Sequence, residues 1–105
     1  MRKMIQDKSH ESSYAVYTLP NCEKCEEIKN FMKEKKIAYE EINVGSMEGM
    51  KKLVGLYINN KDKIVLDEKG AIVLPILVKS YSGYTKIIQD VKEMKKEIGS
   101  LLSLL

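Results

Sequence analysis

The chain has 105 residues, of which 44% are hydrophobic and 31% charged. This length predicts a single domain, and this composition allows a compact core and argues against wholesale disorder. The 18 basic and 15 acidic side chains leave a formal net charge of +3, which is too small and too interspersed to indicate nucleic-acid binding. No apolar run reaches the roughly 18 residues of a membrane span, and the N-terminus lacks the apolar stretch of a signal peptide. We therefore expect a cytoplasmic protein with no nucleic-acid or membrane partner.

The first half of the chain begins with a polar segment and then alternates between strand and helix patterns. Residues 1–12 are polar and aperiodic, which predicts a flexible N-terminal arm before a domain over residues 13–105. The run Tyr14–Leu19 is rich in β-branched and aromatic residues and predicts a buried strand. From Cys25 onward, apolar residues recur at helical spacing until the cationic run Lys33–Lys36, which suits the negative end of a helix dipole.

A second strand and a second helix follow. Ile37–Val44 reads as a strand, and Ser46 is suited to cap the next helix. The apolar residues of that helix form one stripe: Met47, Met50, Leu53, Val54, Tyr57 and Ile58. We expect the methionines at these helical positions to fill the core.

The segment before the second proline predicts a hairpin. Ile64–Leu66 and Ala71–Leu74 flank the four residues Asp67–Gly70, a pattern typical of a short hairpin loop. Pro75 cannot donate to a sheet ladder, so it starts a strand or sits at a bend. Because the segment after Val78 looks too short for a full fourth strand, we expect this extra hairpin to supply the edge pairing of the sheet.

The end of the chain predicts a last helix. The residues Tyr81–Gly83 form the turn into it. Its apolar stripe comprises Ile87, Ile88, Val91, Met94, Ile98, Leu101, Leu102 and Leu105. The alternation of strands and helices along the chain predicts an α/β layer structure whose first strands are parallel.

The chemistry of the sequence centres on two cysteines. The motif Cys22-Glu23-Lys24-Cys25 stands where the first strand meets the first helix. A sulfur at a helix N-terminus faces unpaired backbone N–H groups and the positive end of the dipole, which stabilise a thiolate. The spacing brings both sulfurs to one side of the first turn, within reach of a disulfide. We predict that Cys22 is the exposed attacking thiolate and Cys25 the resolving thiol.

Two other interpretations of the cysteine pair are weaker. A zinc or iron–sulfur site needs four ligands, and the chain offers two cysteines and one histidine, His10. Purely structural cysteines remain possible, yet a surface-facing Cys22 has no packing reason to be cysteine. We therefore expect no metal and no cofactor.

Three landmarks in the chain resemble glutaredoxin. The stretch Val16–Cys25 matches the family around its cysteines, and Leu74-Pro75 matches the cis-proline that faces them. A glycine turn before the last helix is matched by the segment Ser82–Tyr84. The resemblance implies a thioredoxin fold, with a central mixed sheet flanked by helices, and a thiol–disulfide oxidoreductase that reduces protein disulfides. The substrate-binding residues that it implies are Pro20, Lys24, Leu74, Pro75, Ser82, Gly83 and Tyr84.

Departures from the family bear on the electron donor. Typical glutaredoxins bind glutathione with a cation three residues before the first cysteine, where this chain has Leu19. They also use an aspartate at the start of the last helix, where the alignment gives Tyr84-Thr85. The turn from Tyr81 is similar to the Trp-Ser-Gly-Phe turn of redoxins that are reduced by thioredoxin reductase. We therefore expect a thioredoxin-reductase-type donor to serve better than glutathione.

A rival resemblance leads to a different class of function. The run Tyr17–Cys22 is also similar to arsenate reductases and to Spx-type regulators. Those families carry Arg-Pro where this chain has Leu74-Pro75, so the arginine that would bind an oxyanion is missing. The alternative function is a redox-sensing or protein-binding module. The partners expected for the main interpretation are disulfide-containing proteins, with the reductase or glutathione as the source of electrons.

Overall fold

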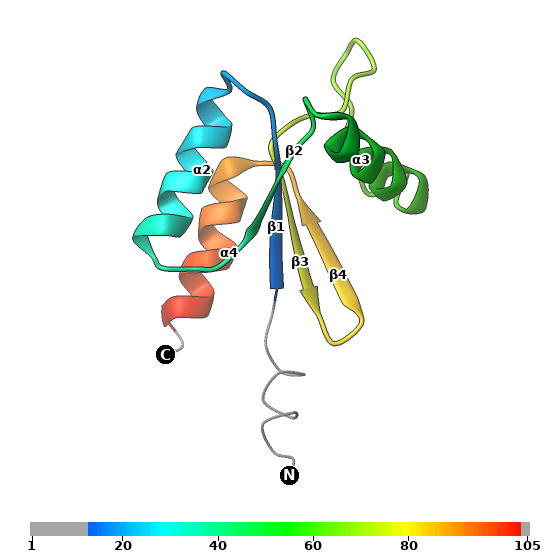
Figure 1. The fold of residues 1–105 in the computed structure, drawn as a ribbon. Coiled ribbons are helices and arrows are strands. Elements are labelled where there is room, and N and C mark those ends of the chain that lie inside the picture. The colour runs from blue at the N-terminus through cyan, green and yellow to red at the C-terminus, as the bar shows by residue number, and fades with distance from the viewer. Residues whose placement is uncertain (1–12, 104–105) are drawn as a thin grey trace.

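The computed structural model describes residues 13–103, which form a four-stranded mixed sheet with helices on both faces (Figure 1). In chain order the elements are β1 (Ser13–Thr18), α2 (Glu23–Glu34), β2 (Glu40–Asn43), α3 (Met47–Asn59), β3 (Ile76–Tyr81), β4 (Tyr84–Ile88) and α4 (Val91–Ser103). The strand order is β2-β1-β3-β4, with β1 parallel to β2 and β3 antiparallel to both β1 and β4. The predicted α/β fold with a mixed sheet is confirmed. The arm over residues 1–12 and Leu105 lie outside the described residues.

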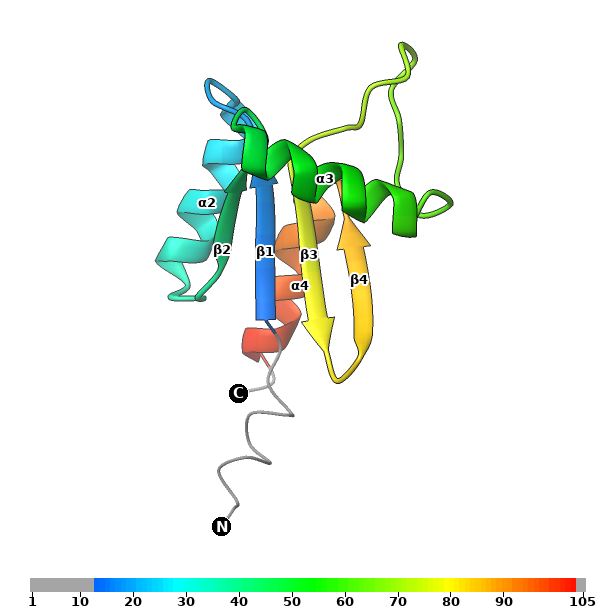
Figure 2. The same cartoon turned by 45° about the vertical axis from the view of Figure 1, so that its right-hand side comes forward.

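The alternation of side chains along the strands builds a core on each face of the sheet. Helices α2 and α4 cover one face, and α3 crosses the other (Figure 2). The core beneath α2 and α4 comprises Tyr14, Val16, Ile28, Met32, Leu77, Ile88, Met94 and Ile98. The core beneath α3 comprises Tyr17, Ile42, Val44, Leu53, Ile76 and Val78. Every strand therefore contributes to holding the sheet between the helices.

The prediction for the end of the chain is wrong in one element. The residues expected to begin the last helix form the edge strand β4, and α4 starts only at Val91. Ile87 and Ile88 match the helical spacing of Val91, yet they point to opposite faces of the sheet, as neighbours in a strand must. Ser82 and Gly83 both have positive φ, 49° and 82°, which is the backbone of a tight hairpin turn. The expected turn into a helix is thus the β3–β4 hairpin.

The segment between α3 and β3 rises above the sheet and adds no strand to it (Figure 2). It folds back on itself through an isolated antiparallel bridge between Leu66 and Ile72. At its tip, the carboxylate of Asp67 accepts hydrogen bonds from the backbone N–H groups of Lys69 and Ala71 at 2.8 and 2.9 Å. The expectation that this segment supplies the edge pairing is wrong, because β3 is long enough to pair with β4.

Helix α3 also differs from its prediction. Ser46 caps it as expected, since its hydroxyl accepts a hydrogen bond from the N–H of Gly49 at 2.9 Å. Leu53 is buried against the sheet, whereas Met47 and Met50 are exposed and fill no core. The single apolar stripe read from the sequence is in fact divided between two sides of the helix.

Within residues 13–103, no helix is long and apolar enough to cross a membrane.

The two glycines of α3 allow a matched test of how closely this helix approaches the sheet. A Cβ added at Gly49 would overlap the backbone oxygen of Asn43, whereas one added at Gly55 would meet nothing within 4 Å. We predict that Gly49→Ala destabilises the fold by about 1–3 kcal/mol, because α3 must move off β2. Gly55→Ala should instead stabilise it by up to about 1 kcal/mol through helix propensity. Urea denaturation measures both, and equal effects would contradict this packing.

Candidate active site

The cysteines lie at the start of α2, just after the loop that follows β1. After β1 the chain passes Pro20 and turns at Asn21, whose φ of 59° lies in the left-handed region that asparagine tolerates. Cys22 then occupies the N-cap of α2, where its Sγ accepts a hydrogen bond from the backbone N–H of Cys25 at 3.2 Å. Its backbone oxygen accepts the first helical hydrogen bond, from the N–H of Glu26 at 3.0 Å. The sulfur therefore faces the electropositive end of a helix.

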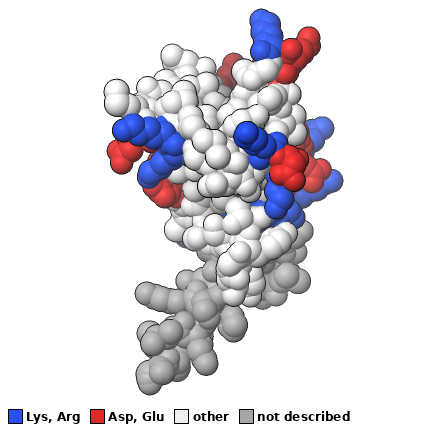
Figure 3. Space-filling model, turned by 90° about the vertical axis from the view of Figure 1, so that its right-hand side faces the viewer, with Lys and Arg blue, Asp and Glu red and all other residues white. Residues whose placement is uncertain are grey.

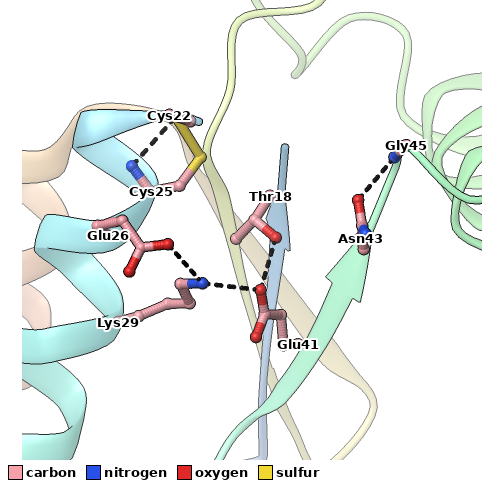
Figure 4. Close-up of polar contacts among 8 residues, drawn as sticks. All are labelled: Thr18, Cys22, Cys25, Glu26, Lys29, Glu41, Asn43 and Gly45. Carbon is pink, nitrogen blue, oxygen red and sulfur yellow. Dashed lines mark hydrogen bonds and ion pairs between the residues drawn. A yellow bond between two sulfur atoms is a disulfide. The ribbon is translucent and has the colours of Figure 1, made fainter. Parts of the chain in front are cut away.

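The two sulfurs are joined in a disulfide, and their surroundings differ (Figure 4). The Cα atoms of Cys22 and Cys25 are 5.2 Å apart, within the range of a disulfide in unstrained backbone. Cys25 is fully buried on the inner side of α2, whereas Cys22 is half-buried. The pair can thus exchange between dithiol and disulfide without moving the helix, and Cys22 is the sulfur nearer to solvent.

Pro75 is distant from the cysteines in the sequence but lies at the same end of the sheet. It is fully buried, and the peptide bond between Leu74 and Pro75 is cis, as the sequence predicts. It directly precedes β3, whose first residue Ile76 pairs with Tyr17 near the end of β1. The antiparallel register therefore delivers Leu74 and Pro75 to the end of β1 from which the cysteines follow.

A polar network around the buried Thr18 ties the first turns of α2 to the central strands, and the sequence analysis did not predict it (Figure 4). Thr18 is almost fully buried, and its hydroxyl donates to the Glu41 carboxylate at 3.0 Å. Lys29 donates to the same carboxylate oxygen at 3.0 Å and to Glu26 at 2.9 Å. The network holds α2 against β1 and β2, and so fixes the helix end that carries the cysteines.

The network also shifts the ionisation of its members. The hydrogen bond from Lys29 lowers the pKa of Glu41 from its ordinary value, and the bond from Thr18 adds to this. Hydrogen bonds to Glu26 and Glu41 raise the pKa of Lys29. In the sequence, the network is visible only as a lysine on one element and a glutamate on the next. That pattern alone does not show that Lys29 and Glu41 form an ion pair.

A second connection fixes the segment between α3 and β3 beside the site. The Gln89 side chain accepts a hydrogen bond from the N–H of Val65 at 2.7 Å. Its amide nitrogen donates to the backbone oxygens of Val65 at 2.9 Å and Val73 at 3.0 Å. One side chain at the β4–α4 corner thereby holds both ends of the protruding segment.

This connection closes one side of a cleft of about 620 Å³ that reaches the dithiol motif. Lys24 lines the cleft from α2, Lys63 from the protruding segment and Asp90 from the start of α4. Lys86 and Glu97 also line it, in an ion pair at 2.8 Å, and Glu97 pairs with Lys79 as well. Of the described residues, Lys24 and Lys63 are two lining cations without an ion pair.

The structure does not bring together all of the expected binding residues. Pro20, Lys24, Leu74 and Pro75 lie at the dithiol end of the sheet. The segment Ser82–Tyr84 forms the β3–β4 turn at the opposite end, because Ser80 pairs with Ser13 at the start of β1. The length of β1 separates this turn from the dithiol by roughly 16 Å. The structure therefore does not bring this turn to the dithiol, contrary to what the resemblance implies.

The true start of the last helix supplies a residue that the sequence alignment missed. Asp90 precedes α4, and its carboxylate accepts a hydrogen bond from the N–H of Glu93 at 3.1 Å. It lies at the dithiol end of the molecule and lines the cleft with Lys24. An aspartate followed by an amphipathic helix is an N-cap signal that would have located it.

Among residues 13–103, no group of three or more His, Cys, Asp or Glu side chains is arranged to hold a metal ion.

Comparison with known proteins shows a likeness to one family over part of the chain. The glutaredoxin family model matches residues 15–61, from β1 to the end of α3, including both cysteines. This part of the chain, a little under half of its length, is therefore similar to glutaredoxins. No curated protein sequence matches the chain significantly.

Two solved structures show that this chain has the thioredoxin fold. Glutaredoxin 1 from Francisella tularensis, solved in complex with cacodylate, is 18% identical with a TM-score of 0.60, over 89% of this chain and 99% of that one. A mutant of the thioredoxin-like protein BC3987 is 20% identical with a TM-score of 0.51, over 80% of this chain and 96% of that one. The glutaredoxin match over residues 15–61 and the cysteine pair support thiol–disulfide oxidoreductase chemistry in general.

The Thr18–Glu41–Lys29 network predicts a pH-dependent contribution to stability. Because the pKa of Glu41 is lower in the folded protein, its contribution is present above its unfolded pKa and is lost as the pH falls through the folded value. We predict that Glu41→Gln, which keeps an acceptor for Thr18, destabilises the protein by up to about 1 kcal/mol near pH 7, and by less near pH 3. Urea denaturation across this range measures the difference.

The matched control for this prediction is Glu40→Gln. Glu40 is the neighbouring residue on β2 and makes an exposed ion pair with Lys52 at 3.2 Å. Its substitution should change stability by less than that of Glu41. A Glu41→Gln effect that is the same at both pH values would contradict the role assigned to the charge.

Proposed function

We propose that this protein reduces disulfides in other proteins through Cys22 and Cys25. The observation that carries the proposal is the N-cap position of Cys22, with its Sγ accepting an amide hydrogen bond while Cys25 is buried three residues later. A helix N-terminus stabilises a thiolate, which is the attacking species in disulfide exchange. Pro75, at the same end of the sheet, supports this assignment.

The reaction proceeds in two exchanges that balance. The Cys22 thiolate attacks one sulfur of the substrate disulfide, forming a mixed disulfide and releasing the other substrate sulfur, which takes up a proton. The Cys25 thiol, deprotonated as it attacks, displaces the second substrate sulfur from Cys22. The products are a reduced substrate dithiol and the Cys22–Cys25 disulfide. Because Cys25 is buried beside Cys22, it meets the mixed disulfide before solvent thiols do.

Reduction of insulin disulfides in the presence of dithiothreitol tests this function. The wild-type protein should accelerate insulin precipitation, and Cys22→Ser should abolish the acceleration, because no attacking thiolate remains. Cys25→Ser should instead accumulate a mixed disulfide with the substrate, detectable by mass spectrometry. Labelling of Cys25 before Cys22 by limiting iodoacetamide would contradict the assigned roles.

The same assay separates the alternative function, a redox-sensing or protein-binding module. That module would form the Cys22–Cys25 disulfide reversibly and yet give no insulin turnover. We favour the enzyme because the half-buried Cys22 is open to a substrate. We place the reaction in the cytoplasm. In that reducing compartment, a close cysteine pair is more often catalytic than structural.

The electron donor is the second part of the proposal. The sequence favours a thioredoxin-reductase-type donor on three grounds: Leu19, Tyr84-Thr85 and the turn from Tyr81. The second ground does not hold, because Thr85 lies in β4 at the far end of the sheet, and Asp90 begins α4. The third ground fails because that turn is the β3–β4 hairpin and does not lead into the last helix. We propose that glutathione binds the cleft, where Lys24 and Lys63 suit its two carboxylates and Asp90 its ammonium group.

Substitution of Lys63 tests the donor. We predict that Lys63→Gln slows reduction of the Cys22–Cys25 disulfide by glutathione about tenfold or more, since one charge-assisted hydrogen bond is lost. Its reduction by dithiothreitol, which has no carboxylate, should be unchanged. Lys69→Gln, on the tip of the same segment and outside the cleft, is the control. If a thioredoxin-reductase-type flavoprotein reduces the wild type faster at matched potential, the donor predicted from the sequence is preferred.

A further inference from the structure

Helix α3 has a second apolar side that faces away from the sheet. Met47, Met50, Val54 and Ile58 are 78%, 46%, 46% and 60% exposed. Their spacing of three, four and four residues places them on one stripe of the helix, turned away from the side on which Leu53 is buried. We call these four residues the α3 outer stripe.

Three residues of the stripe, Met47, Met50 and Val54, also line a hollow in the surface. In the view that faces α3 and β4, a broad area free of charged side chains lies between separate groups of charges (Figure 3). At the N-terminal half of α3 the surface is hollowed, with a volume of about 590 Å³. Its lining residues are Val44, Gly45, Ser46, Met47, Met50, Lys51 and Val54. Monomeric proteins seldom expose contiguous apolar surface of this kind unless it binds something.

The hollow adjoins the loop that leads to the cysteines. A Cβ built on Gly45 would lie 3.3 Å from Cδ of Pro20, so the two loops are in close contact. Pro20 and Leu19 are themselves exposed, Leu19 to 41%. Apolar surface therefore continues from the dithiol loop through the hollow onto α3. A partner seated on the stripe would extend toward Cys22.

The charge at the edge of the hollow indicates what kind of partner fits. Lys51 is exposed on the edge of the stripe and has no ion pair among the described residues. Its neighbour Lys52 is already paired with Glu40. An apolar segment with a carboxylate beside it would satisfy both the stripe and Lys51.

A second copy of the chain fits this surface poorly. Antiparallel pairing of two α3 helices that sets Met47 against Ile58 of the other copy would bring both Lys51 ammonium groups to one side of the seam, where they repel. Four side chains on a helix of 13 residues also fall well short of the roughly 800 Å² per partner of a stable interface. A small contact is instead typical of transient redox encounters.

We propose that the α3 outer stripe and its hollow dock an acidic amphipathic helix of the protein whose disulfide is exchanged at Cys22. This rests on the proposed function. Apolar side chains of the partner helix pack on Met50 and Val54, and a carboxylate of the partner pairs with Lys51. The contact raises the local concentration of the partner disulfide at the dithiol without taking part in the chemistry.

The test uses designed peptides that carry one terminal disulfide loop. The first is a helix with an apolar seam and flanking glutamates, the second has flanking lysines, and the third has a scrambled seam. For the wild type we expect kcat/KM to be highest for the first. Val54→Gln and Lys51→Gln should each lower it about fivefold to tenfold for that peptide. Both should leave the reduction of bis(2-hydroxyethyl) disulfide unchanged.

Two controls keep the outcomes separate. Lys52→Gln lies next to Lys51 on the same helix but away from the hollow, and it should leave every rate unchanged. Binding of the acidic peptide with its cysteines replaced by serine, measured by fluorescence anisotropy, reports docking without any redox step. If no disulfide is reduced and this peptide still binds, the proposed function fails and the docking surface stands.

Other results would overturn the docking proposal. Equal kcat/KM for the three peptides, or unchanged values in both variants, would show that the stripe does not select the partner. Sedimentation of the wild type as a dimer that Val54→Gln converts to a monomer would show instead that the stripe is covered by a second copy.

Discussion

The position of β1 between one parallel and one antiparallel neighbour determines where everything functional in this protein lies. Parallel pairing with β2 makes both strands end on the same side, so that the turn to α2 and the loop after Val44 emerge together. Because β3 is antiparallel to β1, Pro75 at the start of β3 lies beside the C-terminal end of β1. A cysteine pair, a buried proline and an apolar hollow thus gather at one edge, although the sequence separates them by many residues.

Local signals account for the parts of the fold that the sequence predicts. The strand before the cysteines, the capped helix after them and the Ser46 cap each depend on neighbours within a few residues, and so they can be recognised from composition and spacing. The sequence also locates the cis peptide before Pro75, since the cis form is largely confined to bonds that precede proline. The chemistry of the site was predictable because it is concentrated in one short motif.

The remaining features depend on tertiary partners. Strand β4 carries Ile87 and Ile88 at a spacing that also suits the next helix, and only pairing with β3 decides between the two. That error displaced the start of the last helix and concealed Asp90. The sequence alone does not distinguish the exposed apolar residues of α3 from its core residues. Helical periodicity shows that apolar residues are spaced along the helix, but it does not show which side of the helix packs on the sheet.

The three hydrogen bonds of Gln89 have a consequence for engineering this scaffold. They anchor the protruding segment at its base, while its tip is organised by Asp67 alone. The Gln89 contacts therefore lie between the tip and the sheet. The tip around Lys69 is an attachment point for a fluorophore or an inserted epitope that would leave the geometry of the cysteine pair undisturbed.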